Sequence, residues 1–283
     1  MTRGTVTVLG ATGKTGRAVA VAALGAGWSV RGTTRDPGSA PPQDGMRWVG
    51  SDLATGQGLA EAFTGADAAY LVMPNVHPGE TEAMARAARL AREAGVTRIV
   101  YHSVADPDDA RMVHHLRKGA AERAVREVAR DAVVLQPCAY QQNLLGAALA
   151  GRIAVPYRLD APFSLVALQD VARAAVVALG EAVPAGSTHV LAGPEELTVT
   201  ELAERATEVL GRPVGAERID PDRWRAEVGD RLPDREAEEL AAMFAAYDQG
   251  GFTADPAPLT ALLGLLGRRP TTWAEQLRDA AGR

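Results

Sequence analysis

Three glycines near the start of the chain, Gly10, Gly13 and Gly16, have the spacing of a turn that holds a phosphate. A short apolar strand precedes them and an alanine-rich helical segment follows. The first glycine can adopt backbone angles closed to other residues, the second lets the backbone approach a pyrophosphate, and the third lets the helix pack closely on the strand. The helix N-terminus then favours an anion. An ordinary flexible turn is the alternative. The residues expected to contact a dinucleotide are Gly10, Ala11, Thr12, Gly13, Lys14, Thr15 and Gly16.

The segments around this turn resemble a known family. VTVLGATGKTGRAVA and VRGTTRDP are similar to the NmrA-like branch of the atypical short-chain dehydrogenases/reductases. SDL, AYLVMP, GVTRIVYHSV, HHLRKGAAERAV, VVLQPCAYQQNL and LLGRRPTTWAEQLRD extend the match over nearly the whole chain. The resemblance implies a Rossmann domain that binds a nicotinamide dinucleotide. Members of the branch include quinone reductases, isoflavone-reductase relatives and redox-sensing regulators.

The end of the second expected strand selects between the two nicotinamide cofactors, because it faces the adenosine ribose. An acidic residue there would bind the 2′-hydroxyl and repel a 2′-phosphate. This strand ends in Thr34 and Arg35, and a guanidinium can hold a phosphate with two charge-assisted hydrogen bonds, assisted by Thr34 and by Arg31. The sequence therefore favours NADP(H) over NAD(H). The alternative is a surface ion pair between Arg35 and Asp36.

Two further pairs of residues are expected beside the cofactor. Asp52 and Leu53 lie in the segment SDL, where the resemblance implies a contact with the adenine edge. A turn or a helix cap is the alternative for Asp52. Met73 and Pro74 lie at the carboxyl end of the fourth expected strand, which is where an open α/β sheet binds its ligand, although they can also simply end the strand.

The resemblance places the chemistry at Lys118. The superfamily uses a Tyr-x-x-x-Lys pair, but here His114 stands in place of the tyrosine, with His115 beside it. His114, Lys118 and Glu122 share one helix face, and an imidazole can move a proton near neutral pH. The alternatives are a partly exposed helix start for the histidines and an i,i+4 surface pair with Glu122 for Lys118.

The other candidates surround the expected substrate. Ser103 corresponds to the superfamily's substrate-orienting serine, and it can bond a carbonyl, the nicotinamide amide or only its own backbone. The single cysteine, Cys138, is interpreted as a small buried hydrophobe. No metal site is predicted. The remaining candidates are Tyr140 as a proton donor, and Asn143, Trp224 and Phe244 as substrate contacts.

Strands and helices alternate along most of the chain, which predicts a doubly wound, mainly parallel α/β sheet of the Rossmann type with a smaller α-rich C-terminal substrate lobe. Residues 1–150, with 166–193 returning to them, should form the dinucleotide-binding domain, and 151–165 and 194–283 the lobe. Capping-box patterns begin late helices after Thr198 and Thr272. Strands are expected at 5–9, 28–34, 46–49, 68–73, 98–103, 132–136 and 189–191, and helices at 14–24, 59–63, 80–94, 113–129, 169–179 and 234–247.

Composition narrows the partners. The chain of 29.6 kDa carries a formal charge of −5 and has a pI near 5.6, so nucleic acid is disfavoured as a partner. No apolar run approaches the ~20 residues needed to span a bilayer. With one cysteine and no leader pattern, a cytoplasmic location is expected. Only two of the 30 basic residues are lysines, Lys14 and Lys118, and both lie in candidate sites. The oligomeric state is left open.

Two functions remain open at this point. The first is an NADPH-dependent oxidoreductase that transfers hydride to a small, apolar quinone, enone or carbonyl compound bound between the Rossmann domain and the lobe. Solvent, His114 or Tyr140 would protonate the product, or a histidine would act as a general acid beside Lys118. The second is a non-catalytic sensor that binds NADP(H) and reports redox state to a partner protein. The missing tyrosine keeps the second function open.

Overall fold

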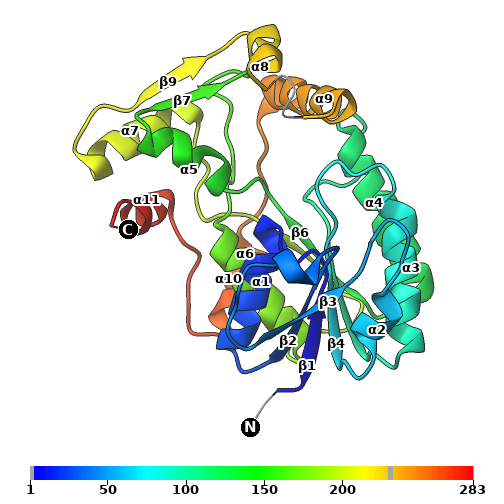
Figure 1. The fold of residues 1–283 in the computed structure, drawn as a ribbon. Helices are drawn as coiled ribbons and strands as arrows, with labels where there is room; N and C mark the ends of the chain where they lie inside the picture. Colours follow the sequence, from blue (N-terminus) through cyan, green and yellow to red (C-terminus); the bar gives the residue numbers. More distant parts are fainter. Residues whose placement is uncertain (1–2, 229–231, 283) are drawn as a thin grey trace. The chain divides into compact units, whose positions relative to one another are not determined.

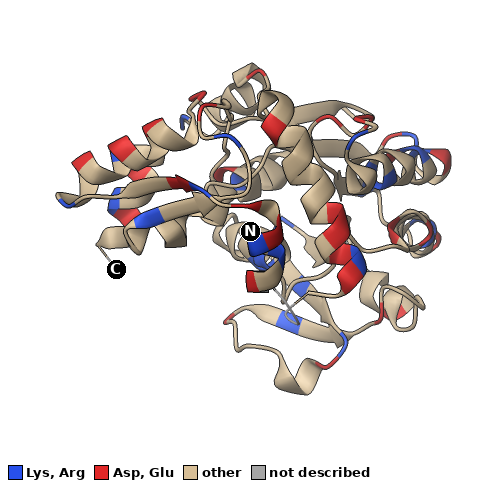
Figure 2. Cartoon of the chain, turned by 90° about the horizontal axis from the view of Figure 1, so that it is seen from above, with Lys and Arg blue, Asp and Glu red and all other residues tan. Residues whose placement is uncertain are grey.

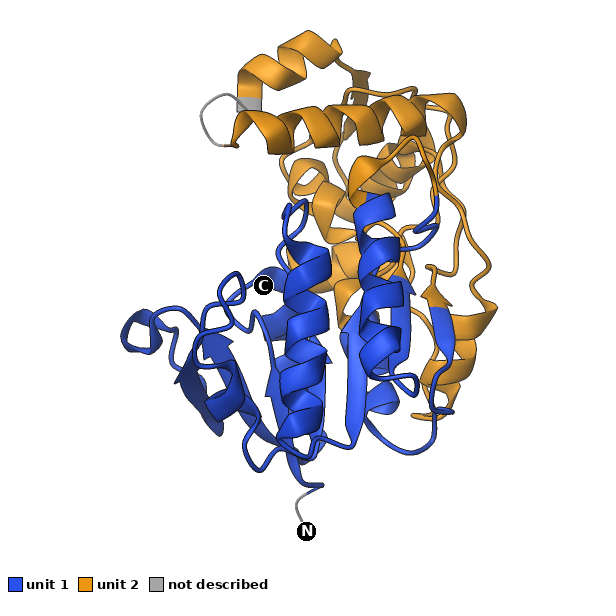
Figure 3. Cartoon of the chain, turned by 90° about the vertical axis from the view of Figure 1, so that its right-hand side faces the viewer, with its two compact units in different colours: residues 1–108, 115–136, 171–189 blue, residues 109–114, 137–170, 190–283 orange. Residues whose placement is uncertain are grey.

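A computed structural model describes residues 3–228 and 232–282 of the chain. The chain divides into two compact units, each assembled from several segments (Figure 3). Unit 1 comprises residues 1–108, 115–136 and 171–189, and unit 2 comprises residues 109–114, 137–170 and 190–283. This division places residues 137–150 in unit 2, whereas the sequence placed them in the dinucleotide-binding domain. The reason is that helix α5 (Gln142–Leu149) contacts strand β7 (Arg152–Val155) and helix α7 (Val199–Leu210).

One sheet of seven strands, most of them in unit 1, has the order β3-β2-β1-β4-β5-β6-β8 (Figure 1). β4 and β5 end two residues and one residue earlier than predicted. The strands are β1 (Thr5–Val8), β2 (Ser29–Thr34), β3 (Met46–Gly50), β4 (Ala68–Leu71), β5 (Arg98–His102), β6 (Val133–Pro137) and β8 (Thr188–Leu191).

The pairings from β3 through β6 are all parallel, with Val6 of β1 opposite Val30 on one side and Ala68 on the other. The strand order reverses at β1, which has β2 and β4 as neighbours. Ligands of open α/β sheets bind at the carboxyl ends of the strands at such a reversal. The predicted doubly wound, mainly parallel α/β fold is thereby confirmed.

Helices cover both faces of this sheet. Figure 1 shows α2, α3 and α4 on one face and α1 and α6 on the other. The helices are α1 (Lys14–Gly25), α2 (Leu59–Phe63), α3 (Glu80–Glu93), α4 (Val113–Val128) and α6 (Leu168–Leu179), with a 3₁₀ turn η1 (Pro37–Ser39) after β2.

The core of unit 1 lies between the sheet and helices α2, α3 and α4. Leu71, Ile99 and Tyr101 project from the strands and meet Phe63 and Met84 from the helices. Burying each such side chain contributes about 1.5–3 kcal/mol. Because the core includes the two central strands β4 and β5, it fixes the carboxyl ends of those strands.

Unit 2 contains a small parallel sheet, in which Arg152 of β7 pairs with Gly215 of β9 (Gly215–Arg218). Capping boxes begin α7 at Thr198 and α11 at Thr272, as predicted. The remaining helices are α8 (Pro221–Val228), α9 (Asp234–Gly250), α10 (Ala257–Gly264) and α11 (Trp273–Ala281).

Candidate functional site

The glycine turn connects β1 to α1 at the strand-order reversal. Gly10 has a φ of 56°, a left-handed conformation that favours glycine. The N–H of Gly13 donates to the carbonyl of Gly10 at 2.9 Å and closes the turn. A Cβ on Gly16 would lie 2.3 Å from the Gly10 oxygen, so the helix approaches the turn as closely as only glycine allows. The turn is therefore a rigid, tightly packed element.

The N-terminus of α1 fits an anionic group. Its N-cap residue, Gly13, offers no side-chain cap, and the first turn contains no acidic residue. Lys14 is the first helical residue, and loss of surrounding water lowers the pKa of its ammonium. The backbone N–H groups and the dipole of this helix end favour a phosphate. The residues present thus fit the diphosphate of a dinucleotide.

The end of β2 lies beside this turn. Thr33 accepts a hydrogen bond from the Gly10 N–H at 3.3 Å. The next residues, Thr34 and Arg35, are half-buried and exposed, respectively. Asp36 does not pair with Arg35 in this described segment. Its carboxylate caps η1 instead, accepting the Gly38 N–H at 3.0 Å, and bonds from Ser39 and Gly38 lower its pKa. The Arg35 guanidinium is therefore placed at the surface where a 2′-phosphate is predicted.

Arg31, which the sequence predicts to assist at a 2′-phosphate, has its partners on α2. Its guanidinium donates to the carbonyl of Ala62 at 2.7 Å and to that of Thr64 at 2.8 Å. These carbonyls belong to the C-terminal end of α2, where the helix dipole favours a cation. Arg31 is thus engaged in holding α2 against the sheet.

The segment after β3 forms a tight turn. The carboxylate of Asp52 accepts the Ala54 N–H at 2.8 Å, as the turn alternative expected. Leu53 packs against the core of unit 1. Adenine contact by this segment stays a prediction, because the bond to Ala54 occupies Oδ1 and an ionised carboxylate has a second oxygen.

Met73 and Pro74 follow β4 and differ in exposure. Met73 is buried and belongs to the core cluster, whereas Pro74 is exposed. Of the two, Pro74 therefore presents more surface to a ligand at the carboxyl end of β4.

A buried ion pair defines the position of Lys118. Its ammonium Nζ lies 2.7 Å from Oε1 of Glu80, and the two side chains are 6% and 1% exposed. The hydroxyl of Tyr101 donates to the same carboxylate oxygen at 2.9 Å. Burial, followed by the charge of Glu80, raises the pKa of Tyr101 well above its ordinary value. The lysine, the carboxylate and the phenol come from α4, α3 and β5.

A second buried carboxylate lies on the same helix. Oε1 of Glu122 accepts a hydrogen bond from the Ser103 hydroxyl and another from the Gln136 amide, the latter at 2.8 Å. The Ser103 hydroxyl is therefore directed at Glu122, which is none of the three partners predicted for it. Its role toward a substrate stays a prediction.

Two alternatives from the sequence are wrong. Lys118 does not form a surface pair with Glu122, because it is buried and bound to Glu80. The histidines are not partly exposed, since His114 and His115 are 3% and 1% exposed. The ring of His115 donates from Nδ1 to the Asp106 carbonyl at 3.0 Å. The buried face of α4 thus includes more polar side chains than the helical spacing of its residues predicts.

Sequence reasoning missed the partners of Lys118 and Ser103. Glu80 lies in the first turn of an expected helix. Acidic residues are common there because they complement the helix dipole, so nothing marked Glu80 as a partner of Lys118. Tyr101 has the place of a core strand residue. The available signal was that polar side chains, among them Tyr101 and Gln136, occur in strands β5 and β6, and that Ser103 directly follows β5.

Comparisons with known proteins agree with this architecture. A family model described as the NmrA-like family matches residues 2–277. The chain belongs to the NmrA-like family. It is 30% identical over 242 residues, 82% of this chain and 83% of the relative, to a (4-alkanoyl-5-oxo-2,5-dihydrofuran-3-yl)methyl phosphate reductase of Streptomyces griseus. The resemblance noted in the sequence is thereby confirmed.

Two solved structures have the same fold. An NADPH-dependent quinone oxidoreductase of Escherichia coli, complexed with NADPH, superposes with a TM-score of 0.81 at 22% identity, covering 97% of this chain and 99% of that one. The negative transcriptional regulator NmrA, in complex with NADP, superposes with a TM-score of 0.78 at 17% identity, covering 99% and 95%. At these identities the likeness shows the fold.

A buried histidine on β5, His102, is expected to make the stability of this NmrA-like protein depend on pH. His102 Nδ1 lies 2.6 Å from the Tyr70 hydroxyl. Burial, and secondarily the charge of Lys118, lowers the pKa of His102 from 6.5 to about 3. In the unfolded chain the His102 imidazole therefore binds a proton below about pH 6.5, whereas in the folded chain it stays neutral. The free energy of unfolding consequently falls as the pH drops below 6.5.

We expect the free energy of unfolding to fall by on the order of 3 kcal/mol between pH 6.5 and pH 4 through His102, at about 1.4 kcal/mol per pH unit. Measuring the free energy of unfolding in urea at several pH values across this range checks the prediction. His102→Gln should flatten the profile, because glutamine can bond Tyr70 without titrating. His189→Gln is the control, since its half-buried histidine has a smaller pKa depression. Equal slopes in wild type and His102→Gln would contradict the assignment.

The other predicted residues of the NmrA-like chain lie in unit 2. Tyr140, half-buried, forms a bridge to Val166, and Asn143 is exposed on α5. Cys138 is buried, and burial raises the pKa of its thiol to about 12, in line with its interpretation as a small hydrophobe. Trp224 packs edge-on against Phe244, with ring centroids 4.9 Å apart.

Trp224 and Phe244 belong to an aromatic cluster of unit 2. Phe244 also meets Tyr157, at a centroid distance of 5.7 Å, and Tyr157 contacts Tyr247. Trp224 and Phe244 are only half-buried, whereas the two tyrosines are buried. The outer pair therefore retains apolar surface, and its contact with a substrate stays a prediction.

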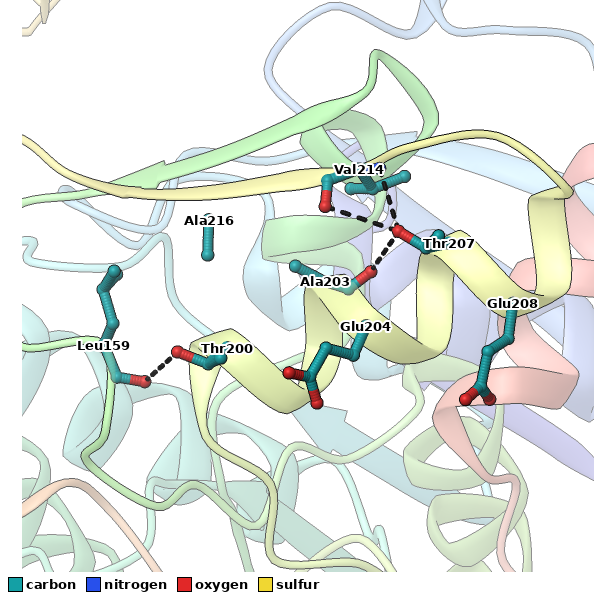
Figure 4. A pocket seen from close by; sticks show the side chains of 8 residues that line it. All are labelled: Leu159, Thr200, Ala203, Glu204, Thr207, Glu208, Val214 and Ala216. Atoms are coloured by element: carbon teal, nitrogen blue, oxygen red, sulfur yellow. Dashed lines mark hydrogen bonds between the residues drawn. The ribbon is translucent and has the colours of Figure 1, made fainter.

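A hollow of about 560 Å³ lies elsewhere on unit 2, between α7 and β9 (Figure 4). The hydroxyl of Thr207 accepts the Val214 N–H at 2.9 Å and donates to the Ala203 carbonyl at 3.1 Å, which fixes its floor. None of the predicted site residues lines it. The lining residues are Leu159, Thr200, Ala203, Glu204, Thr207, Glu208, Val214 and Ala216.

Charges of both signs are interspersed over the helices (Figure 2), with exposed pairs such as Arg223 with Glu227 and Arg225 with Glu238. Such exposed pairs contribute little to stability.

Over residues 3–228 and 232–282, no helix has the length and hydrophobicity to cross a membrane.

Proposed function

We propose that this protein is an NADPH-dependent oxidoreductase that reduces a small, apolar quinone, enone or carbonyl compound. The glycine turn carries the proposal, because its φ at Gly10, its contact at Gly16 and the uncapped start of α1 together form a cradle for a diphosphate. The curated relative from Streptomyces griseus, a reductase, and the Escherichia coli quinone oxidoreductase support the reaction type.

A bound nicotinamide supplies the hydride. The protein's part is to bind and orient. An ammonium has three N–H donors, and Glu80 accepts one from Lys118, so two remain for the ribose hydroxyls of the cofactor. Tyr101 is unsuited to donate a proton to product, because its hydroxyl is committed to Glu80 and its pKa is raised. Protonation falls to solvent, to His114 or to Tyr140.

The exposed guanidinium of Arg35 should decide between NADP(H) and NAD(H). In Arg35→Ala we expect the dissociation constant of NADP(H) to rise about 10- to 100-fold, because a charge-assisted pair to the 2′-phosphate is lost, while that of NAD(H) stays the same. Titration calorimetry with both dinucleotides checks this.

Arg31→Met, in the strand that precedes Arg35, is the control, because the Arg31 guanidinium binds α2. It should lower stability and leave the ratio of the two affinities unchanged. A ratio that is equal in Arg35→Ala and wild type would reject Arg35 as the selecting residue.

The second candidate function is a sensor that binds NADP(H) without turnover. The observation in its favour is the commitment of the phenol near Lys118 to a buried carboxylate, in a chain that lacks the Tyr-x-x-x-Lys tyrosine. The solved regulator NmrA shares the fold.

One experiment separates the two functions. Purified protein is incubated with NADPH and a panel of quinones, conjugated enones and ketones, and oxidation of NADPH is followed by its absorbance. Turnover with any acceptor supports the oxidoreductase. Tight binding of NADPH by calorimetry without turnover supports the sensor, and no binding of any pyridine dinucleotide overturns both.

A further inference from the structure

We propose that Glu80 is a positioning residue for Lys118, which holds the lysine ammonium where it can bind the ribose of the cofactor. The inference rests on the proposed function for its ligand, and on the described side chains of unit 1 for its geometry.

The ion pair is buried on both sides. Lys118 Nζ and Glu80 Oε1 are 2.7 Å apart, and neither side chain is more than 6% exposed. Removing an ammonium from water costs several kcal/mol unless an anion and hydrogen bonds compensate for it. Glu80 supplies both, because its carboxylate is a charge and an acceptor at once.

The carboxylate itself is held in place. Glu80 is the first residue of α3, where the helix dipole and free N–H groups favour an anion. Tyr101, on β5, donates to the same oxygen that Lys118 contacts. Contacts from a strand and from two helices thus fix the acceptor, and through it the ammonium.

The ion pair also restrains a flexible side chain. A lysine side chain has four flexible methylenes, and ordering it costs conformational free energy. Glu80 orders the side chain before any ligand binds, so that less is lost on binding. Because one N–H points to Glu80, the direction of the other two is also restricted.

The rarity of lysine in this chain makes the test direct. With ¹⁵N-lysine labelling only Lys14 and Lys118 give side-chain signals, and Lys14→Arg assigns them. A buried ammonium in an ion pair exchanges its protons slowly with water, so Lys118 should give an NH₃⁺ cross-peak in the protein without ligand. NADPH affinity is measured in parallel by calorimetry.

In Glu80→Gln the Lys118 cross-peak should be lost and NADPH should bind about 10-fold more weakly, the equivalent of one charge-assisted hydrogen bond. Tyr101→Phe is the matched control, because it removes the second bond to the carboxylate and keeps the ion pair. It should retain the cross-peak and bind NADPH within about twofold of wild type.

A retained cross-peak together with unchanged affinity in Glu80→Gln overturns the proposal. If this variant does not fold, Glu80→Asp keeps the charge but withdraws the carboxylate by one methylene. It should weaken the cross-peak and the affinity, and wild-type values for both would overturn the proposal equally. The cross-peak is measured without NADPH, so it tests the anchoring of Lys118 independently of the proposed function. Failure of the wild-type protein to bind NADPH would overturn the proposed function and leave this measurement valid.

Discussion

Gly16→Ala is expected to unfold more easily than wild type and to bind nucleotide at least 10-fold more weakly. The added Cβ would lie 2.3 Å from the carbonyl oxygen of Gly10 and 3.0 Å from that of Leu9. Approaches under 3.0 Å are essentially never seen for real Cβ atoms. Because both neighbours are backbone atoms, α1 and the turn must move apart.

The expected cost is about 1–3 kcal/mol or more in the free energy of unfolding, which is the usual range for overpacking a well-packed site. It exceeds the gain of up to about 1 kcal/mol that alanine brings to a helix over glycine. The shift also moves the N–H groups of α1 away from those of the glycine turn. A single diphosphate can then no longer accept hydrogen bonds from both groups of donors.

Gly25→Ala is the control within the same helix. Gly25 is exposed, and a Cβ there meets nothing within 4 Å, so the variant should gain up to about 1 kcal/mol and bind nucleotide as wild type does. Urea unfolding and calorimetry on both variants decide the matter. If Gly16→Ala matched wild type in both measurements, the close packing of α1 on the turn would not be what forms the cradle.

The sequence predicted the elements of unit 1 well because local signals mark their ends. α2 has the predicted bounds, Leu59–Phe63, and α1 differs by one residue. Glycines and apolar runs supply these signals without reference to distant parts of the chain. Alternation of these elements with right-handed crossovers then predicts a doubly wound parallel sheet, although it leaves the order of the strands open.

Unit 2 was harder because its pairings are long-range. β7 and β9 have four residues each, and Arg152 pairs with Gly215, which is 63 residues away in the sequence. Neither strand has a run of apolar residues long enough to predict it. No local pattern therefore separates these strands from loops, and α5, which packs on β7, was missed with them.

The site shows the same limit at the level of side chains. The resemblance to the superfamily identified Lys118 from its motif, and Ser103 from its position at the end of an expected strand. The only protein partner that the sequence offered Lys118 was the alternative, Glu122, because i,i+4 spacing says nothing of Glu80, a residue 38 positions earlier. The packing of the core decides which faces of α3 and α4 lie against each other. This packing depends on residues far apart in the sequence, so no local pattern predicts it.

Lys118→Met should lower the free energy of unfolding by about 3–5 kcal/mol, because it leaves the buried carboxylate of Glu80 without its cation. Methionine has nearly the length of lysine, so the loss of packing is small. Lys14→Met is the control, since Lys14 is exposed and its replacement should change stability by no more than about 0.5 kcal/mol.

A double-mutant cycle tests whether the cost comes from the unpaired charge. Glu80→Gln alone leaves the ammonium unpaired and should be costly too, whereas the double variant Lys118→Met/Glu80→Gln buries no charge at this position. Because replacing both members of a buried ion pair is often near neutral, the double variant should be more stable than either single variant. Urea unfolding of the four proteins measures the coupling. Additive losses would show that Lys118 and Glu80 do not depend on each other, and the buried pair would then have no part in holding the lysine.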